Sequence, residues 1–455
     1  MAVSQKIRFR LALWLGKLVG CFLKFLGRKG TTFPGLVAQK ICPDIIKILA
    51  ASFTGKIIII TGTNGKTTTN GLLASILKAA RKTVAFNREG ANMLKGVIGT
   101  LLQSTDLGGQ IKTSFLLLEV DEGTVPHLCR QLTPAVAVIT NFFPDQLDRY
   151  GEVETTVNLV QKALPSSTLL VLNADDPLVA QLACGESKEA CYYGVDYFPA
   201  LGEKSKGSGE EQCPRCKSKL QYNLVHYGQL GIYTCSSCEF KRPRVNIEAQ
   251  GVKLTEKGLA FQVAEEDYQL PLLGFYNLYN ALAAFCAAEC LGVNRETIKK
   301  GLETFVAEAG RMENFGGPGF NLTLTLVKNP IGFNQVIHTL IKLDKSIALL
   351  MAINDLASDG RDVSWLWDVD FERLCRQEEN INYLICSGLR AEDLALRLKY
   401  AGFKEEKIII EPDLKKAVQS LEQKKTDSLE TFFALSNYSA LFPLREILRS
   451  KGWKS

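Results

Sequence analysis

The chain has 455 residues, of which 46% are hydrophobic and 22% charged, and its formal net charge at neutral pH is +6. This composition is that of a globular protein, and the length provides for two or three domains. The charge excess is too small to indicate nucleic acid as a partner by itself.

The N-terminal segment, residues 1–50, is basic. Its apolar stretch at residues 11–26 is interrupted by Lys17 and Lys24, so it is too short and too charged to span a membrane. It also lacks the clean core and small-residue cleavage site of a signal peptide. The pattern is typical of a basic amphipathic helix, which we expect either to rest on an anionic membrane surface or to pack against the body of the protein.

A glycine-rich turn follows the apolar run at residues 56–60 and precedes a predicted helix at residues 67–77. Small residues let backbone N–H groups close around a phosphate, and a helix N-terminus adds partial positive charge. Lys66 is expected to reach the terminal phosphates of ATP, and the Thr67 hydroxyl to hold Mg²⁺; the alternative is a plain turn. The predicted nucleotide-binding residues of this turn are Gly62, Thr63, Asn64, Gly65, Lys66, Thr67 and Thr68.

Further apolar runs alternate with helical segments as far as residue 200. They lie at residues 84–86, 115–120, 135–140 and 169–173. Buried runs separated by helices indicate a parallel sheet covered on both faces. Because ligands of such sheets bind beyond the carboxyl ends of the strands, Glu119 is expected to bind Mg²⁺ near Lys66, with Asp121 and Glu122 as possible helpers. The alternative is an acidic loop exposed to water.

Polar residues also follow the next two strands. Asn141, Asp145 and Asp148 either orient water around the metal or form a capping and turn cluster. The sequence Asn-Ala-Asp-Asp-Pro at residues 173–177 is a turn by composition, and we expect it to be structural.

Residues 199–212 are rich in Gly, Ser, Glu and Lys and lead into an insertion, residues 200–245. Two Cys-x-x-Cys pairs at this separation predict a zinc ribbon whose four thiolates leave no open position, so the metal is structural. Redox pairs or unrelated cysteines are the alternatives. The other cysteines lie mostly in apolar stretches, which suits buried thiols in a reducing cytoplasm. The predicted zinc ligands are Cys213, Cys216, Cys235 and Cys238.

Helical periodicity returns at residues 270–301, where Asn277 and Asn280 share one helical face and are placed to reach an adenine edge. Arg311 follows at the junction into the last domain, where an arginine can clamp the γ-phosphate when domains close. Beyond it, strands predicted at residues 322–327, 347–353, 383–386, 408–410 and 432–435 alternate with helices at 371–377, 391–401 and 414–421. We therefore expect a central α/β domain with a parallel sheet at residues 51–305 and a smaller Rossmann-like α/β domain at residues 306–455.

Taken together, these motifs resemble the Mur ligase superfamily. The matching elements run in family order from Thr61 to Glu313. The resemblance implies an enzyme that uses ATP to convert a carboxylate into an acyl phosphate, which an amine then attacks to form an amide. It implies that Lys66 and Thr67 bind phosphate and Mg²⁺ and that Glu119 binds Mg²⁺. It also implies that Asn277 contacts the nucleotide and Arg311 clamps it.

Departures from the superfamily pattern narrow the resemblance to one branch. The histidines usual beside residues 145–148 are absent, and Lys162 is only a candidate for the lysine that is carbamylated in many relatives. The N-terminal segment is too short to hold a UDP-sugar. These departures, the four-cysteine insertion and the motif Asn-Asp-x-x-x-Asp-Gly-Arg-Asp-x-Ser-Trp at residues 354–365 resemble the MurT family over essentially the whole chain.

The resemblance to the MurT family implies a substrate and a partner. MurT chains are the synthetase subunits of lipid II isoglutaminyl synthases, which amidate the D-glutamate α-carboxyl of the lipid II stem peptide. Their ammonia comes from a separate GatD-type glutaminase. By position in the motif, Asp362 is expected to complete the partner's Cys-His pair, with Asp355 and Asp359 as weaker candidates and a plain polar turn as the alternative.

Two other functions stay open on the sequence alone. A stand-alone amino-acid ligase, of folylpolyglutamate or UDP-sugar peptide type, is disfavoured by the short N-terminal segment. A zinc-ribbon nucleic-acid-binding NTPase has slight support from Lys241, Arg242 and Arg244. We expect instead a cytoplasmic enzyme that meets lipid II at the membrane surface and binds no nucleic acid.

Overall fold

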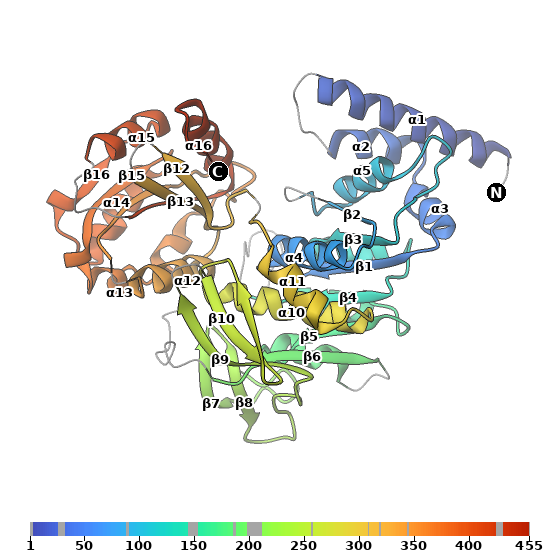
Figure 1. Ribbon diagram of the computed structural model, residues 1–455, viewed down its shortest axis with the longest axis horizontal. Helices are drawn as coiled ribbons and strands as arrows, with labels where there is room; N and C mark the ends of the chain where they lie inside the picture. The colour runs from blue at the N-terminus through green and yellow to red at the C-terminus, as the bar shows by residue number, and fades with distance from the viewer. Residues whose placement is uncertain are drawn as a thin grey trace.

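The computed structural model describes residues 3–25, 32–87, 91–143, 153–184, 188–197, 212–255, 258–307, 309–317, 320–343, 345–424 and 431–454. Two sheets, each covered by helices, form the body of the molecule, and a short two-stranded ribbon projects from the larger one (Figure 1).

The larger sheet has nine strands in the order β11-β10-β9-β6-β5-β4-β1-β3-β2. Its parallel centre was predicted. Strand β1 pairs with β3 on one side and with β4 on the other, and the paired residues are mostly buried Ile, Leu and Val. The predicted strands are β1 (Lys56–Thr61), β2 (Val84–Phe86), β3 (Phe115–Glu119), β4 (Val136–Ile139) and β5 (Leu169–Asn173). Strand β6 (Ala190–Val195), which pairs with β5 in parallel, was not predicted.

Three further strands extend this sheet beyond β6. Strand β9 (Ile247–Thr255) pairs with β6 in parallel, whereas β10 (Gly258–Val263) and β11 (Glu266–Leu270) continue as antiparallel neighbours. The sequence did not predict this extension. The ribbon strands β7 (Leu220–Tyr227) and β8 (Leu230–Cys235) lie between β6 and β9 in sequence and form a separate two-stranded sheet.

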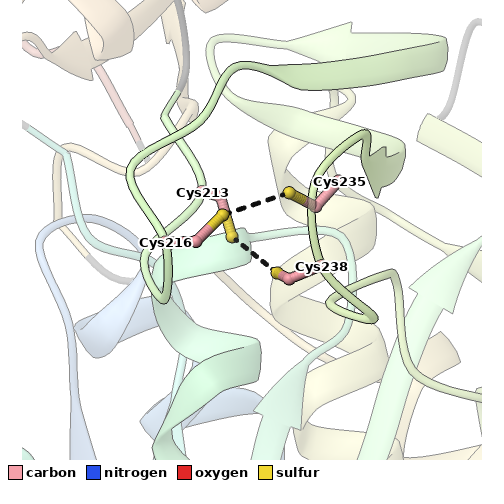
Figure 2. Close-up of side chains that lie close together, drawn as sticks. All are labelled: Cys213, Cys216, Cys235 and Cys238. Atoms are coloured by element: carbon pink, nitrogen blue, oxygen red, sulfur yellow. Dashed lines mark hydrogen bonds between the residues drawn. The ribbon is translucent and has the colours of Figure 1, made fainter.

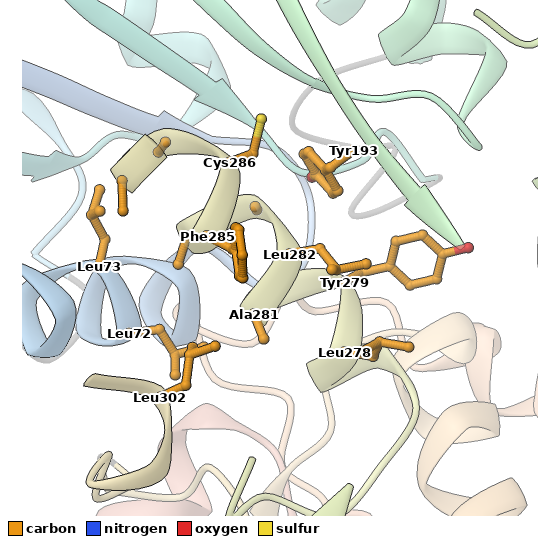
Figure 3. Packing of buried hydrophobic residues seen from close by; sticks show 14 of the residues in the cluster. Leu72, Leu73, Tyr193, Leu278, Tyr279, Ala281, Leu282, Phe285, Cys286 and Leu302 are labelled. Carbon is orange, nitrogen blue, oxygen red and sulfur yellow. The ribbon is translucent and has the colours of Figure 1, made fainter. Parts of the chain in front are cut away.

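Helices α4 (Lys66–Ala79), α10 (Tyr276–Cys290) and α11 (Arg295–Glu303) cover one face of the larger sheet (Figure 3). Leu72 and Leu73 of α4 pack against Ala281 and Phe285 of α10 within one buried cluster. Gly301 allows α11 to approach α4 closely, since an added Cβ would lie 2.5 Å from the Ile76 Cα. The opposite face is covered by α5 (Leu94–Ser104), α6 (Val125–Cys129), α8 (Val153–Ala163) and α9 (Pro177–Ala180).

The predicted N-terminal helix is present as α1 (Val3–Phe25), followed by α2 (Thr32–Ile41) and α3 (Ile45–Ser52). Ala12 and Leu13 of α1 are fully buried. Lys17 donates through Nζ to the carbonyl oxygens of Leu102 (2.7 Å) and Thr105 (2.5 Å), which lie at the C-terminal end of α5. One face of α1 therefore packs on the body. Among the described residues, no helix is both long and apolar enough to cross a bilayer.

The second sheet has six strands in the order β12-β13-β17-β14-β15-β16. Its five parallel strands were predicted: β13 (Phe320–Leu326), β14 (Ile347–Ala352), β15 (Ile381–Ser387), β16 (Ile408–Ile410) and β17 (Thr431–Ser436). Strand β12 (Glu313–Gly317) adds an antiparallel edge that was not predicted. The flanking helices are α12 (Pro330–Ile341), α13 (Phe371–Cys375), α14 (Ala391–Tyr400), α15 (Leu414–Gln423) and α16 (Tyr438–Ser450).

Candidate functional site

The turn between β1 and α4 has a shape that only glycine allows at two positions. Gly62 has φ +123°, and an added Cβ would lie 2.3 Å from the Thr140 Oγ1. Gly65 has φ +87°, and its Cβ would lie 2.0 Å from the Asn280 Oδ1. Helix α4 begins at the next residue, Lys66, so its unpaired N–H groups open onto this turn. The turn, residues 62–68, is hereafter the phosphate loop.

The end of β4 braces the phosphate loop without any ligand. Asn141 accepts the Asn64 N–H through its side chain (2.9 Å) and the Thr63 N–H through its carbonyl oxygen (2.8 Å). Thr140 Oγ1 donates to the Asn64 carbonyl oxygen (2.7 Å). Of the two roles open to Asn141, the structure shows the turn-holding one; Asp145 and Asp148 lie outside the described residues.

Lys66 is buried beneath the phosphate loop. Its ammonium donates to the carbonyl oxygens of Gly62 and Thr63 and forms an ion pair with Glu122 at 3.1 Å. Burial alone would lower the pKa of Lys66, but the carboxylates of Glu122, Asp121 and Glu119 together raise the pKa above its ordinary value. The lysine therefore keeps its charge inside the site.

Glu119 is also buried, which excludes the exposed-loop alternative. Its Oε1 accepts from the Asn92 side-chain amide at 3.3 Å, whereas Oε2 has no hydrogen-bond partner among the described residues. A buried carboxylate oxygen without a donor is rare in folded proteins, and oxygen ligands are what Mg²⁺ takes. Glu119 and the Thr67 hydroxyl line the same cavity, so the residues present fit a Mg²⁺ ion.

The cavity that holds these groups has a volume of about 1110 Å³ and is lined from both sheets' domains. Arg311 lies at the junction and donates from Nη2 to the Thr67 Oγ1 at 3.2 Å. Asn329, which caps the N-terminus of α12, donates to the Asn64 Oδ1 at 3.1 Å. The C-terminal domain therefore touches the phosphate loop directly. Lys162, in the last turn of α8, does not line this cavity.

A second, smaller pocket lies beside the phosphate loop and is lined by Tyr227, Asn277, Asn280 and Gln335. The Asn280 Nδ2 donates to the Asn277 Oδ1 at 3.0 Å, and the Asn277 Nδ2 donates to the Leu273 carbonyl oxygen at 2.7 Å. Both asparagines therefore line a pocket beside the phosphate loop, and their contact with a nucleotide base stays a prediction. Tyr227 comes from the ribbon, and no local sequence signal pointed to it.

The three aspartates of the C-terminal motif lie in different environments. Asp355 forms an ion pair with Arg390 at 2.7 Å, and Asp359 accepts the Ser439 N–H at 2.9 Å while lining the large cavity. Asp362 is exposed and accepts the Ser364 N–H at 2.8 Å. That hydrogen bond lowers the pKa of Asp362. Asp362 lines neither of the two pockets.

The four ribbon cysteines converge at one end of the β7–β8 hairpin (Figure 2). Their sulfur atoms all lie within 4.8 Å of one another, with 3.6 Å between Cys213 and Cys238 and 3.4 Å between Cys216 and Cys235. Tetrahedral zinc with Zn–S bonds of about 2.3 Å would place the sulfurs about 3.8 Å apart. The four side chains therefore fit a zinc ion. All thirteen cysteines are free thiols in the structure.

The turn after β5 joins the ribbon to the sheet. Asp175 is fully buried and accepts from Arg242 (2.6 Å), from the Tyr279 hydroxyl (2.6 Å) and from the Val195 N–H (2.9 Å). Asp176 accepts from the Phe142 N–H (2.9 Å). The structural role expected for this turn is confirmed. Because Arg242 is bound inside the protein, the basic cluster that favoured nucleic acid loses one of its three members.

The buried carboxyl of Asp176 predicts a pH-dependent stability. Burial raises the pKa of Asp176 to about 6, although the Phe142 N–H and Gln229 side chain act in the opposite direction. In the unfolded chain the same pKa is about 4. Between these values the folded state binds more protons, so this group stabilises the fold below about pH 4, and that stabilisation is lost as the pH rises through about 6.

Urea titrations of the wild type and Asp176→Asn between pH 4 and pH 7 measure this effect. We expect the free energy of unfolding of the wild type, relative to the variant, to rise by about 2–3 kcal/mol as the pH falls over this range. The exposed Asp267→Asn serves as the control and should show no such trend. A constant difference between wild type and Asp176→Asn would contradict the raised pKa.

Family models match two parts of the chain. The model described as the Mur ligase middle domain matches residues 60–212, and the one described as MurT ligase C-terminal matches residues 326–441. The protein named lipid II isoglutaminyl synthase (glutamine-hydrolyzing) subunit MurT from Staphylococcus aureus (strain COL) is 38% identical, covering 96% of this chain and 97% of that protein. The protein of the same name from Streptococcus pneumoniae is 34% identical over 98% of each.

Solved structures with the same fold include a pseudomurein peptide ligase type C from Methanothermus fervidus. Its TM-score is 0.66 at 24% identity, covering 89% of this chain and 80% of that chain. MurF ligase from Thermotoga maritima, solved in complex with ADP, has a TM-score of 0.62 at 16% identity, covering 90% of this chain and 82% of that chain. At these identities, the similarity establishes the shared fold.

Proposed function

The chain belongs to the MurT family of Mur-type ligases, and we propose that it is the synthetase subunit of a lipid II isoglutaminyl synthase. It would amidate the D-glutamate α-carboxyl of the lipid II stem peptide, giving D-isoglutamine, with ammonia from a glutaminase partner. One observation carries this proposal: a single cavity between the domains brings together Lys66, Thr67, Glu119 and Arg311.

The reaction needs one phosphoryl transfer followed by one acyl transfer. Bound ATP with Mg²⁺ supplies the phosphoryl group, and the ADP-bound fold relative supports this choice of nucleotide. A substrate carboxylate oxygen forms a bond to the γ-phosphorus while the bond to the β–γ bridging oxygen breaks, releasing ADP. Ammonia then attacks the carbonyl carbon of the acyl phosphate, phosphate leaves with the C–O bond electrons, and the proton lost by the nitrogen leaves with it as hydrogen phosphate.

The residues of this chain would stabilise the charge that moves during transfer. The phosphate loop and Lys66 would bind the phosphates, and Thr67 together with the unpartnered oxygen of Glu119 would hold Mg²⁺. Arg311, already at the Thr67 hydroxyl, would reach the γ-phosphate from the domain junction. Because the C-terminal domain also contacts Asn64, its position controls whether these groups converge.

The purified chain with Mg-ATP, lipid II and ammonium chloride tests this function. We expect amidated lipid II and ADP to form with ammonium but not with glutamine. Mass spectrometry of lipid II detects the amidated product. Lys66→Ala should reduce the ammonium-driven rate by about a hundredfold or more, because the substitution removes the buried positive charge that stabilises the transferring phosphoryl group. The exposed Lys82→Ala is the matched control. ADP formation only with added free amino acids would instead indicate a stand-alone amino-acid ligase.

We assign the contact with the glutaminase partner to Asp362. Of the three aspartates in the motif, Asp355 is held by Arg390 and Asp359 faces the large cavity. The exposed Asp362 carboxylate would orient the histidine of a GatD-type subunit and stabilise its imidazolium.

In the reconstituted complex, Asp362→Asn should lower glutamine-driven amidation by about a thousandfold or more, as expected when an orienting carboxylate is lost. Ammonium-driven amidation should stay at the wild-type rate, because Asp362 lines neither pocket. Asp368→Asn, a nearby exposed aspartate, is the control. Equal losses with both nitrogen sources would contradict this assignment.

We further propose that Cys213, Cys216, Cys235 and Cys238 hold a structural zinc ion. Four thiolates fill a tetrahedral shell, so no position stays open for water or substrate. The spacing of the sulfur atoms supports this assignment.

We propose that the protein is cytoplasmic and binds the inner membrane surface, and the outward face of α1 supports this location. Trp14, Leu18 and Phe22 recur every four residues along one stripe and are 58%, 66% and 60% exposed. Helix α1 contains no acidic residue, and the basic residues Lys6 and Arg10 precede Trp14 at the same four-residue spacing. A basic helix with an exposed apolar stripe is suited to the interface of an anionic bilayer, where lipid II is anchored.

Replacing Trp14 and Leu18 together by serine should reduce sedimentation of the chain with phosphatidylglycerol vesicles by about tenfold, because buried apolar area is lost. Wild-type binding should weaken as salt rises. Leu159→Ser, an exposed leucine on α8, is the control. Vesicle binding that is unchanged in the double variant would exclude α1 as the contact.

A further inference from the structure

The two ends of the ribbon hairpin carry different groups. Its cysteines lie at one end, since Cys216 precedes β7 and Cys235 closes β8. The turn that joins the two strands, Tyr227-Gly228-Gln229, lies at the other end (Figure 1). Strand β7 has eight residues, so the two ends are about 25 Å apart.

The hairpin turn is inserted between the two domains. Gly228 has φ +55°, and an added Cβ would lie 2.9 Å from the Phe143 ring and 3.7 Å from the Ile331 side chain. Phe143 follows β4, whereas Ile331 is in the first turn of α12. The turn therefore occupies the space between the brace of the phosphate loop and the C-terminal domain.

Tyr227 presents an aromatic wall to the small pocket beside the phosphate loop. Its ring lies 6.0 Å from Phe143 and 5.7 Å from Tyr279, measured between ring centroids, so it is held by aromatic neighbours. The same pocket is lined by the amide side chains of Asn277 and Gln335. An aromatic face with amide groups at its edge provides both stacking and hydrogen bonding for a purine ring.

Hydrogen bonds tie the hairpin turn to both sides of this pocket. The Gln229 side chain donates to the Phe142 carbonyl oxygen and to Asp176 (3.2 Å). The adjoining Phe143 N–H donates to the Thr63 Oγ1 in the phosphate loop (3.0 Å). On the other side, Asp175 links Arg242 of the insertion to Tyr279 of α10.

We propose that the hairpin turn, through Tyr227, forms one wall of the site for the nucleotide base, so that the ribbon belongs to the ATP site. This inference rests on the proposed function, because it takes the nucleotide phosphates to lie on the phosphate loop. It follows that order at the cysteine end affects base binding about 25 Å away, while the phosphates are bound by the phosphate loop rather than by Tyr227.

Equilibrium binding to the full chain with Mg²⁺ tests this by comparing ADP with inorganic tripolyphosphate, which has no base. We expect Tyr227→Ala to weaken ADP binding by about tenfold, as is typical when an aromatic base-stacking partner is lost, and to leave tripolyphosphate binding unchanged. Tyr227→Phe should retain ADP binding. Gln221→Ala, on the exposed face of β7, is the control.

A second variant, with Cys235 and Cys238 both replaced by serine, tests the distant end. We expect it to lose bound zinc, measured by elemental analysis, and to weaken ADP binding but not tripolyphosphate binding. Unchanged ADP affinity in Tyr227→Ala, or equal weakening of both ligands, would overturn the inference. Wild-type chain that binds neither ligand would overturn the proposed function, and this inference with it.

Discussion

The phosphate loop is confined on three sides, and at two of them the contacts leave no room for a side chain. Gly62 lies against Thr140 of β4, Gly65 lies against Asn280 of α10, and Asn64 is bonded to Asn329 of the C-terminal domain. The conformational entropy of a loop fixed in this way is lost during folding rather than on ligand binding. The same confinement means that both domains and the smaller pocket meet at one short turn.

The positive charge within the site is also held by contacts that exist before any ligand binds. Three carboxylates gather around Lys66 and keep it protonated despite its burial. Removing any of them would leave a more weakly compensated buried cation, whereas a bound phosphate would add to the compensation. One oxygen of Glu119 has the opposite need, because no described residue donates a hydrogen bond to it. A bound cation would supply the missing partner of this oxygen.

The sequence predicted what depends on local pattern. Continuous apolar runs such as residues 57–60 identify buried parallel strands, and a Gly-Lys-Thr turn after one of them identifies the phosphate loop. Strands β9 to β11 were missed because buried and exposed side chains are mixed along them, so they lack the continuous apolar run that identified the central strands. Tyr227 was missed for another reason: the turn that carries it meets its partners only through folding, as with Gln229 and Phe142, 87 residues apart.

The contact between Lys17 and the end of α5 fixes the direction in which the apolar stripe of α1 faces. Because Lys17 neutralises carbonyl oxygens at a helix C-terminus, α1 is fixed in rotation about its own axis, and its apolar stripe keeps one orientation relative to the large sheet. A chain held on a bilayer by that stripe would present its cavity at one constant height and tilt. Its encounter with a lipid-anchored substrate would then be a search in two dimensions, limited by lateral diffusion rather than by concentration in the bulk.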